Sequence, residues 1–92
     1  EEIETSKLTL IESHIETECP DLWYIVGTIK NITDSELTYA QISFNLYDKE
    51  GNQVGTTSDN IIDLEAHGTW KFKAIVIMDT ASDYKLKELS GD

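Results

Sequence analysis

The stretch ISFNLYD, residues 42–48, alternates apolar and polar side chains in the middle of the chain. Together with Ala40, the apolar residues Ile42, Phe44 and Leu46 fall on one face of an extended strand, because every second side chain points the same way. Polar and amphipathic residues fall on the other face. The pattern predicts a central strand with one buried face, around which the rest of the fold is arranged.

The sequence directly after this strand is typical of a tight turn. Residues 48–51, DKEG, place Asp at the first position and Gly at the fourth, where a positive φ completes a type I turn with a G1 bulge. A hairpin is therefore predicted, and its second strand is expected at residues 53–58, antiparallel to the central one.

Further strands are predicted on both sides of the hairpin. Residues 22–30 alternate strictly, and Gly27 within them predicts the close approach of an aromatic ring. Residues 69–78 and 84–89 alternate again, and residues 61–64 are expected to form a short strand or a crossing segment.

Two features near the N-terminus complete the strand pattern. Residues 7–18 change parity after Leu10, which predicts a β-bulge, because one extra residue reverses the faces that follow. Residues 1–6 are expected to be frayed or to form a short edge strand, and residues 19–21 (CPD) break the pattern because Pro cannot donate to a ladder. Short strands at this spacing predict an all-β, immunoglobulin-like antiparallel sandwich of about seven strands with Greek-key connections.

Composition limits the functions that this fold can serve. Residues 1–92 suffice for a single domain, and we expect that domain to be excised from a longer protein because the chain starts at Glu1 without Met. A net charge of −11 and the lack of Arg disfavour nucleic acid as a partner. No apolar run is long enough for a membrane helix. A lone Cys19, interpreted as a small apolar residue, excludes an intrachain disulfide.

Several short motifs resemble those of the FxLYD domain family of prokaryotic cell-envelope proteins. Residues 44–48 (FNLYD) fit the motif that names the family, and residues 27–31 (GTIKN) resemble its G-x-V-x-N segment. Residues 48–51 resemble its D-x-x-G turn, and residues 66–68 (AHG) stand in the place of its P-G-E-like turn, without the Pro. The resemblance covers roughly residues 8–89.

The resemblance implies an immunoglobulin-like sandwich within a secreted or lipid-anchored bacterial or archaeal protein, often of unknown function. An extracellular or cell-envelope location and a lipid anchor elsewhere in the parent chain are thus expectations from the family, since no lipobox is present in these residues. The family supplies no shared catalytic motif to transfer. The motif itself is better explained by folding than by binding, because Phe44 and Leu46 are core positions and Asp48 starts the turn.

The residue types of metal sites are present but lack the usual spacing. His14 and His67 have no paired His or Cys neighbours, as a zinc site would require. A copper site of the cupredoxin type needs a late Cys-His-Met cluster, whereas Cys19 comes early and Met78 has no His nearby. We therefore expect no cofactor.

The carboxylates and the candidate nucleophiles likewise lack the spacing of a calcium loop or of an enzyme active site. The turn at residues 48–51 lacks the remaining oxygen ligands of a calcium loop, although weak calcium binding near Asp59 and Asp63 stays open. No nucleophile elbow or Gly-rich oxyanion loop accompanies the Ser, His, Asp and Cys residues, so we do not expect an enzyme. Residues 31–33 (NIT) fit the glycosylation sequon, and their predicted loop position permits modification of Asn31.

One group of residues suggests an interaction surface. Four lysines have outward parity on the last two predicted strands, which we expect to pair side by side, and two tyrosines share the outward face of the central strand. These lysines either protect sheet edges from aggregation or form, with the tyrosines, a face that docks an acidic partner or a neighbouring domain. The candidate residues are Tyr39, Tyr47, Lys71, Lys73, Lys85 and Lys87.

Two functions are therefore carried forward. The first is a non-catalytic extracellular or cell-envelope module that acts as a spacer or protein-interaction domain. The alternative is a carrier of a small ligand or metal ion such as calcium, with its site in the loops at one end of the sandwich.

Overall fold

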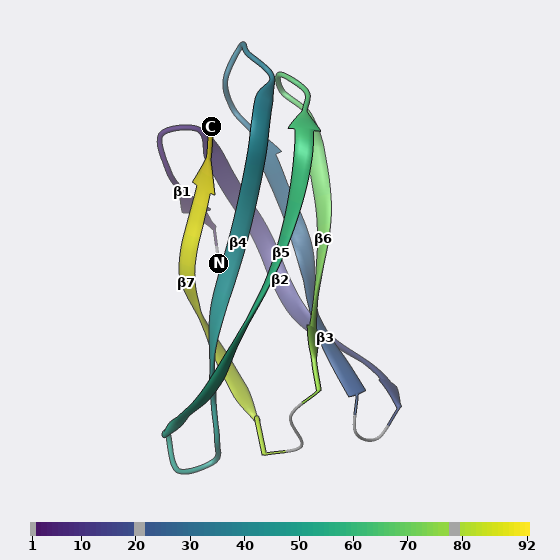
Figure 1. The fold of residues 1–92 in the computed structure, drawn as a ribbon, viewed down its shortest axis with the longest axis vertical. Helices are drawn as coiled ribbons and strands as arrows, with labels where there is room; N and C mark the ends of the chain where they lie inside the picture. The colour runs from purple at the N-terminus through teal and green to yellow at the C-terminus, as the bar shows by residue number, and fades with distance from the viewer. Residues whose placement is uncertain (1, 20–21, 78–79) are drawn as a thin grey trace.

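The computed structural model, which describes residues 2–19, 22–77 and 80–92, consists of two antiparallel sheets packed face to face (Figure 1). One sheet has the strand order β1-β2-β3-β6 and the other has the order β5-β4-β7. The strands are β1 (Ile3–Glu4), β2 (Leu8–Cys19), β3 (Leu22–Asn31), β4 (Leu37–Tyr47), β5 (Gln53–Leu64), β6 (Thr69–Val76) and β7 (Asp83–Gly91).

Three connections pass from one sheet to the other, namely β3 to β4, β5 to β6 and β6 to β7. They give the sandwich its Greek-key connectivity. The predicted all-β, immunoglobulin-like antiparallel sandwich is thus confirmed. The break expected at residues 19–21 falls mainly on residues 20 and 21, which lie outside the described residues. Met78 and the side chain of Cys19 lie outside them as well.

The core lies between the sheets and is centred on Phe44 of β4, which is 1% exposed. Its ring packs 5.8 Å from the ring of Phe72 on β6 and 5.3 Å from that of Tyr84 on β7, measured between centroids. The alternating apolar residues of β3, β4 and β6 supply most of the remaining buried side chains. Three strands from different parts of the sequence therefore form the core, as their period of two predicts.

The predicted bulge and the predicted aromatic contact are both present. The β2–β3 register shifts between Leu10 and Glu12, which leaves one extra residue in β2. Opposite the shifted segment, a Cβ atom on Gly27 would lie 2.8 Å from the ring of Phe72 and would also meet the backbone oxygen of Glu12. Only glycine fits there, because the bulged strand and the aromatic ring both approach its backbone closely.

The hairpin turn after β4 has the predicted geometry. Gly51 adopts a φ of 88°, and its backbone N–H donates to the carbonyl of Asp48 over 3.1 Å. The Asp48 carboxylate accepts bonds from the backbone N–H of Asn52 at 2.8 Å and of Glu50 at 3.0 Å. These bonds, led by the one from Asn52, lower the pKa of Asp48 because they favour its charged form. The final Asp of the FNLYD motif is thus a turn residue.

Two expectations about the strands are wrong. β5 is a single strand that pairs with β4 from Gln53 to Leu64, although residues 61–64 were expected to form a separate element. The polar pair Asp59-Asn60 resembles a break in the sequence, but Asp59 faces inward and accepts a bond from a β6 amide. Secondly, β6 pairs with β3 while β7 pairs with β4, so the last two strands lie in different sheets.

Asn31 also differs from its expected position in a loop. It is the last residue of β3 and is fully buried. Its side-chain amide donates to the carbonyls of Ser35, Leu64 and Glu65, and its side-chain oxygen accepts two bonds from Thr33. The asparagine of the sequon therefore connects three segments of the fold and is not presented for glycosylation in the folded domain.

Candidate functional site

The outer face of the β5-β4-β7 sheet is the surface that best fits a binding role. The inward residues of β4 alternate with residues on the outer face of the sheet, of which Ser43 is itself buried, and the β4–β5 register places outward residues of β5 beside them. We call the part of this surface that β4 and β5 form, without the outward residues of β7, the tyrosine face. It consists of Tyr39, Gln41, Ser43, Asn45 and Tyr47 on β4 and of Thr56, Ser58 and Asn60 on β5.

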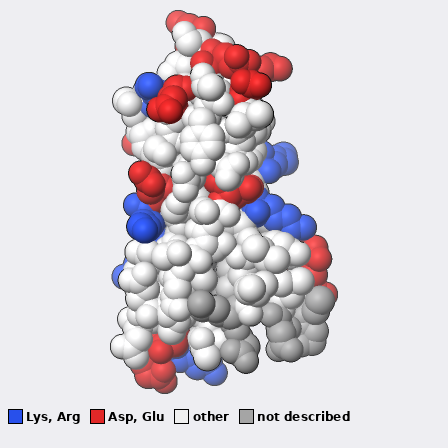
Figure 2. Space-filling model, viewed as in Figure 1, with Lys and Arg blue, Asp and Glu red and all other residues white. Residues whose placement is uncertain are grey.

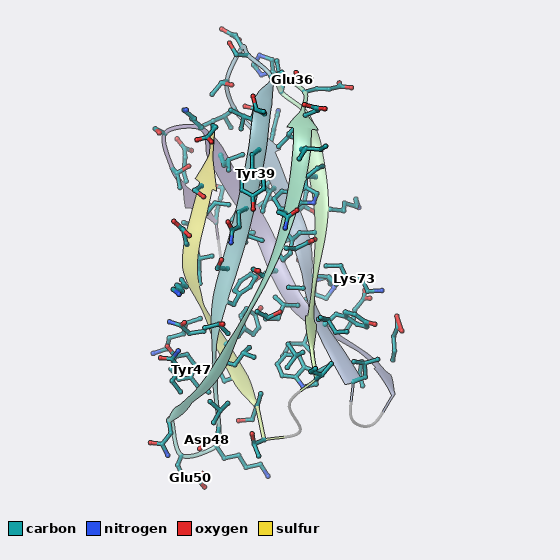
Figure 3. The ribbon with its side chains drawn as sticks, viewed as in Figure 1. Glu36, Tyr39, Tyr47, Asp48, Glu50 and Lys73 are labelled. Carbon is teal, nitrogen blue, oxygen red and sulfur yellow. The ribbon has the colours of Figure 1, made fainter. Side chains whose placement is uncertain are left out.

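A chain of hydrogen bonds orders one half of the tyrosine face. The Tyr39 hydroxyl donates to the side-chain oxygen of Gln41 over 3.2 Å, and the Gln41 amide donates to the Ser43 hydroxyl over 3.1 Å. Because its hydroxyl reaches the residue two positions further along, the Tyr39 ring lies along β4, as Figure 3 shows. The ring is partly exposed, and the exposed side chain of Ile62 lies beside it on β5.

The tyrosine face carries no ionisable group other than the tyrosine hydroxyls, although 27% of the chain is Asp, Glu or Lys. Figure 2 shows an uncharged strip along this face, with acidic and basic side chains on both sides of it at mid-height and further acidic side chains at both ends of the molecule. The charges nearest to the strip come from β7, where Lys85 pairs with Asn45 and Glu88 with Ser43.

At one end of the tyrosine face lies a hollow of about 470 Å³. Tyr47 lines it together with the turn residues Asp48 and Lys49 and with Asp83 and Lys85 at the start of β7. The Lys85 amine lies 5.3 Å from the centre of the Tyr47 ring and so covers part of it. The hollow combines an aromatic ring with several hydrogen-bonding groups and has the volume of a small-ligand pocket.

The structure divides the six candidate residues between the two sheets. Four of them belong to the β5-β4-β7 sheet, namely Tyr39 and Tyr47 on β4 and Lys85 and Lys87 on β7. Lys71 and Lys73 lie on β6 of the other sheet, and Figure 3 shows Lys73 far from both tyrosines. The lysines therefore do not form one surface, because the expected pairing of their strands does not occur.

All four lysines nevertheless lie on edge strands, since β6 and β7 are each the last strand of their sheet. This position suits the protection of edges against aggregation. Lys73 also has local partners: its amine binds a Glu18 carboxylate oxygen at 3.1 Å and lies 4.1 Å above the Tyr24 ring. The Glu18 bond raises the pKa of Lys73.

The outer face of the β1-β2-β3-β6 sheet is charged and has a shallow depression of about 270 Å³. His14 stands there between Glu12, whose carboxylate lies 2.9 Å from the histidine Nδ1, and Glu16, 3.7 Å from its Nε2. The hydrogen bond to Glu12 is the main cause that raises the pKa of His14. The second histidine, His67, contacts Asp34 at 2.7 Å and joins two loops.

The two sides of the sandwich differ in how they are closed. On one side, the Thr57 hydroxyl donates to the Ile75 carbonyl over 2.6 Å and the Asp59 carboxylate accepts from the Lys73 amide over 2.8 Å. Side chains of β5 thereby satisfy part of the free edge of β6.

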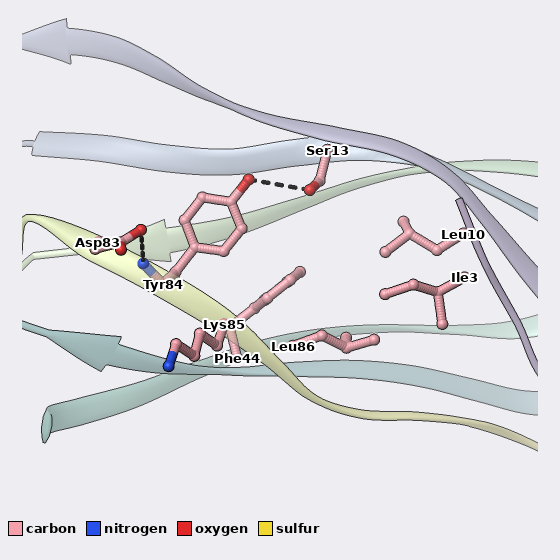
Figure 4. Close-up of a pocket in the computed structure, with 8 residues that line it drawn as sticks. All are labelled: Ile3, Leu10, Ser13, Phe44, Asp83, Tyr84, Lys85 and Leu86. Atoms are coloured by element: carbon pink, nitrogen blue, oxygen red, sulfur yellow. Dashed lines mark hydrogen bonds between the residues drawn. The ribbon is translucent and has the colours of Figure 1, made fainter. Parts of the chain in front are cut away.

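On the other side, between β2 and β7, a groove of about 440 Å³ reaches the core residues Leu10 and Phe44 (Figure 4). One hydrogen bond of 3.0 Å spans it, between the hydroxyls of Tyr84 and Ser13. Leu10 and Phe44 stay buried at the bottom of the groove, the partly buried side chain of Leu86 also lines it, and the charged residues Asp83 and Lys85 lie at its rim.

Residues 2–19, 22–77 and 80–92 contain neither a grouped set of metal ligands nor a membrane-spanning helix. In these ranges no three side chains of His, Cys, Asp or Glu are grouped so that they could hold a metal ion. Within the same ranges no helix has the length and apolar character needed to cross a membrane. Of the two carboxylates that the sequence offers for calcium, that of Asp59 already binds the β6 backbone.

Sequence reasoning identified the two tyrosines but missed the residues between and beside them. In the sequence the outward residues of β4 are only the polar half of an alternating strand. Asn60 was missed because the second hairpin strand was expected to end at residue 58, whereas Thr56 and Ser58 lie within the expected strand but were not assigned to a face. Residues 54–62 (VGTTSDNII) do not alternate apolar and polar side chains, so the sequence carries no clear signal for the face on which the β5 residues lie.

Comparison of the chain with protein-family models, with curated proteins and with solved structures finds no match. The fold thus defines an immunoglobulin-like sandwich as the class of this domain, and the FxLYD similarity stays a resemblance of short motifs.

Proposed function

We propose that this chain is a non-catalytic module of an extracellular or cell-envelope protein that serves as a spacer or as an interaction domain. The location is proposed from the resemblance to the FxLYD family, whose members are commonly parts of secreted or lipid-anchored proteins. The interaction role is supported by one observation, the uncharged tyrosine face on an otherwise strongly acidic domain. A surface kept free of charge needs little desolvation energy when a partner covers it.

The sheet edges support the same choice of surface. The free edges of β6 and β7 carry the lysines, which oppose pairing with further strands. The tyrosine face has no such charges. A partner is therefore expected to contact the flat side of the β5-β4-β7 sheet.

The proposal is tested by binding of the purified domain to isolated cell envelopes of its source organism. Ser58→Glu places a charge in the centre of the tyrosine face and is expected to weaken binding at least tenfold. Thr69→Glu is the matched control, because Thr69 is equally exposed but lies on β6 of the other sheet. Equal binding by both variants would remove the tyrosine face from the proposal. Absence of binding by the unmodified domain would remove the interaction role and leave that of a spacer.

Lysine variants test the docking of an acidic partner. Because Lys71 and Lys85 lie on different sheets, they are reversed separately. Docking through the tyrosine face predicts that Lys85→Glu weakens envelope binding and that Lys71→Glu does not. The opposite order would place the partner on the β1-β2-β3-β6 sheet.

The alternative is a carrier of a small ligand, and the hollow beside Tyr47 favours a site at that end of the sandwich. For a metal ion, calcium is the ion to test. A calcium ion that binds only the folded domain would raise its melting temperature. Such a rise would support the role of a calcium carrier, whereas an unchanged melting temperature would remove it.

A further inference from the structure

The tyrosine face offers a particular combination of chemical groups. Amides of Gln41, Asn45 and Asn60 and hydroxyls of Ser58 and Thr56 each act as donor and acceptor of hydrogen bonds. None of these groups is ionised. A ligand that matches them must also donate and accept along its length without net charge.

Other large partners match this surface less well. A stable protein contact usually has a core of large apolar or Arg side chains, and serine and threonine are under-represented among the residues that dominate its binding energy. Nucleic acids and anionic membranes need several basic groups, whereas the β7 residues beside the tyrosine face include Lys85 together with the acidic Asp83 and Glu88. A chain of sugar rings carries many hydroxyls and needs only hydrogen-bonding groups and aromatic surface.

We propose that the tyrosine face binds an uncharged polysaccharide laid along β4. This inference rests on the interaction role proposed above and names the chemical class of its partner. The glycan hydroxyls would bond to the row of amides and hydroxyls, and the Tyr39–Gln41–Ser43 hydrogen bonds already order these three side chains. Binding then requires little further ordering of these side chains, which favours affinity.

Tyr39 is the stacking residue in this arrangement. Its ring lies along the strand and is partly exposed, so one ring face is open to the C–H bonds of a sugar ring, which carry a slight positive charge. Ile62 widens the apolar surface beside it. The hydroxyl of Tyr39 is already used by Gln41, which leaves the ring itself for contact.

Tyr47 marks the other end of the bound chain. It stands eight positions after Tyr39, and at ~3.4 Å per residue the Cα atoms of the two tyrosines are about 27 Å apart along β4. This length accommodates several sugar rings in a row. The hollow beside Tyr47 supplies the Asp83 carboxylate and the Lys85 amine as hydrogen-bonding groups for the last ring.

Charge explains why the glycan is expected to be neutral. The domain carries a net charge of −11, and acidic side chains gather at both ends of the strip in Figure 2. A carboxylated or sulfated polysaccharide would be repelled along its whole length. A neutral polysaccharide avoids this repulsion, and its binding should change little with ionic strength.

The test uses the polysaccharides of the source organism, separated by anion exchange into a neutral and an acidic fraction. Electrophoresis of the domain through native gels that contain either fraction measures binding as retardation. We expect the neutral fraction to retard the domain at both low and high salt. Tyr39→Ala should weaken the effect at least tenfold, and Tyr39→Phe should retain most of it because the ring remains.

Tyr24→Ala is the matched control, because Tyr24 is a partly buried tyrosine on the outer face of the other sheet. Melting curves establish that each variant is folded. The proposal is overturned if the neutral fraction does not retard the domain, or if Tyr39→Ala and Tyr24→Ala behave alike.

Treatment of the envelopes separates this proposal from the more general one. Periodate, which oxidises vicinal diols of sugars, should abolish envelope binding, whereas protease should not. If protease abolishes it and periodate does not, the partner is a protein, and the glycan proposal fails while the interaction role stands.

Discussion

Replacement of Asn31 tests how this sandwich is held together at the end where β3, β4 and β5 meet. In Asn31→Ala, three backbone carbonyls lose the amide that donates to them at 2.9 Å, 3.3 Å and 2.9 Å. The carbonyl of Leu64 is in a buried contact, and an unsatisfied buried acceptor costs about 1–3 kcal/mol. The other lost bonds are partly exposed, and water can replace them at about 0.5–1.5 kcal/mol each.

The expected loss in the free energy of unfolding is therefore about 3 kcal/mol, since water recovers part of the bonds that reach the surface. For a domain of this size, such a loss lowers the melting temperature by about 12–24 °C. Asn31→Asp should be at least as destabilising at neutral pH, because it places a carboxylate oxygen against three carbonyl oxygens. Protonation of that carboxylate at low pH would restore one donor. It should therefore bring the free energy of unfolding of Asn31→Asp closer to that of the unmodified domain.

Urea unfolding followed by tryptophan fluorescence measures the effect, because the side chain of Trp70 is buried in the core. Asn60→Ala serves as the control, since Asn60 is exposed on β5, and its cost should stay below about 0.5 kcal/mol. A loss of less than about 1 kcal/mol in Asn31→Ala would refute the assignment of a structural role to this side chain. Expression in a host that modifies sequons should likewise yield folded domain with Asn31 unmodified, as mass spectrometry can show; a folded, glycosylated product would contradict the reasoning.

Three further predictions concern other parts of the fold. Gly27→Ala should cost about 3 kcal/mol or more through steric overlap, whereas Gly51→Ala, with open space but a positive φ, should cost about 1–2 kcal/mol, both measured by urea unfolding. Asp59→Ala should lower the free energy of unfolding by about 1–2 kcal/mol and increase self-association in light scattering, relative to the exposed charge control Glu36→Ala. His14→Gln should lower the melting temperature near about pH 5.5 but not near about pH 8.5, because the raised pKa of His14 gives stability that is complete below ~6.5 and lost as pH rises through the folded value.

Specific outcomes would contradict each of these three. Equal costs for the two glycine variants would mean that the close approach at Gly27 is relieved without strain. Unchanged association of Asp59→Ala would show that the β6 edge is protected by its lysines alone. A destabilisation by His14→Gln that grows with pH would have the wrong sign for a histidine stabilised in its protonated form.

The sequence predicted those parts of the fold that depend on local rules. The period of two in β3, β4 and β6 reflects burial of one face, and the turn at Asp48 and Gly51 follows from the backbone angles that these residues favour. The contact of Gly27 with an aromatic ring was also predicted, because a glycine inside a regular strand often marks the place where a bulky neighbour approaches the backbone.

The sequence did not predict relations between distant strands. Nothing in residues 69–89 shows that β6 joins β3 while β7 joins β4, since both strands have the same alternation. The end of β5 was misjudged because Asp59 is polar yet faces inward, where it bonds to the β6 backbone. The tyrosine face depends on the β4–β5 register. The sequence therefore predicted its two tyrosines but not the β5 residues beside them.

The open groove beside β7 determines where this domain opens locally. β7 is bonded along its length to β4 alone and is tied across the groove by the hydroxyls of Tyr84 and Ser13. Its amide protons should therefore exchange with solvent sooner than those of β3 or β4, because local opening starts where the fewest contacts must be broken. Such an opening leaves the β4–β5 hairpin paired, so most of the tyrosine face keeps its shape even while the neighbouring strand is detached.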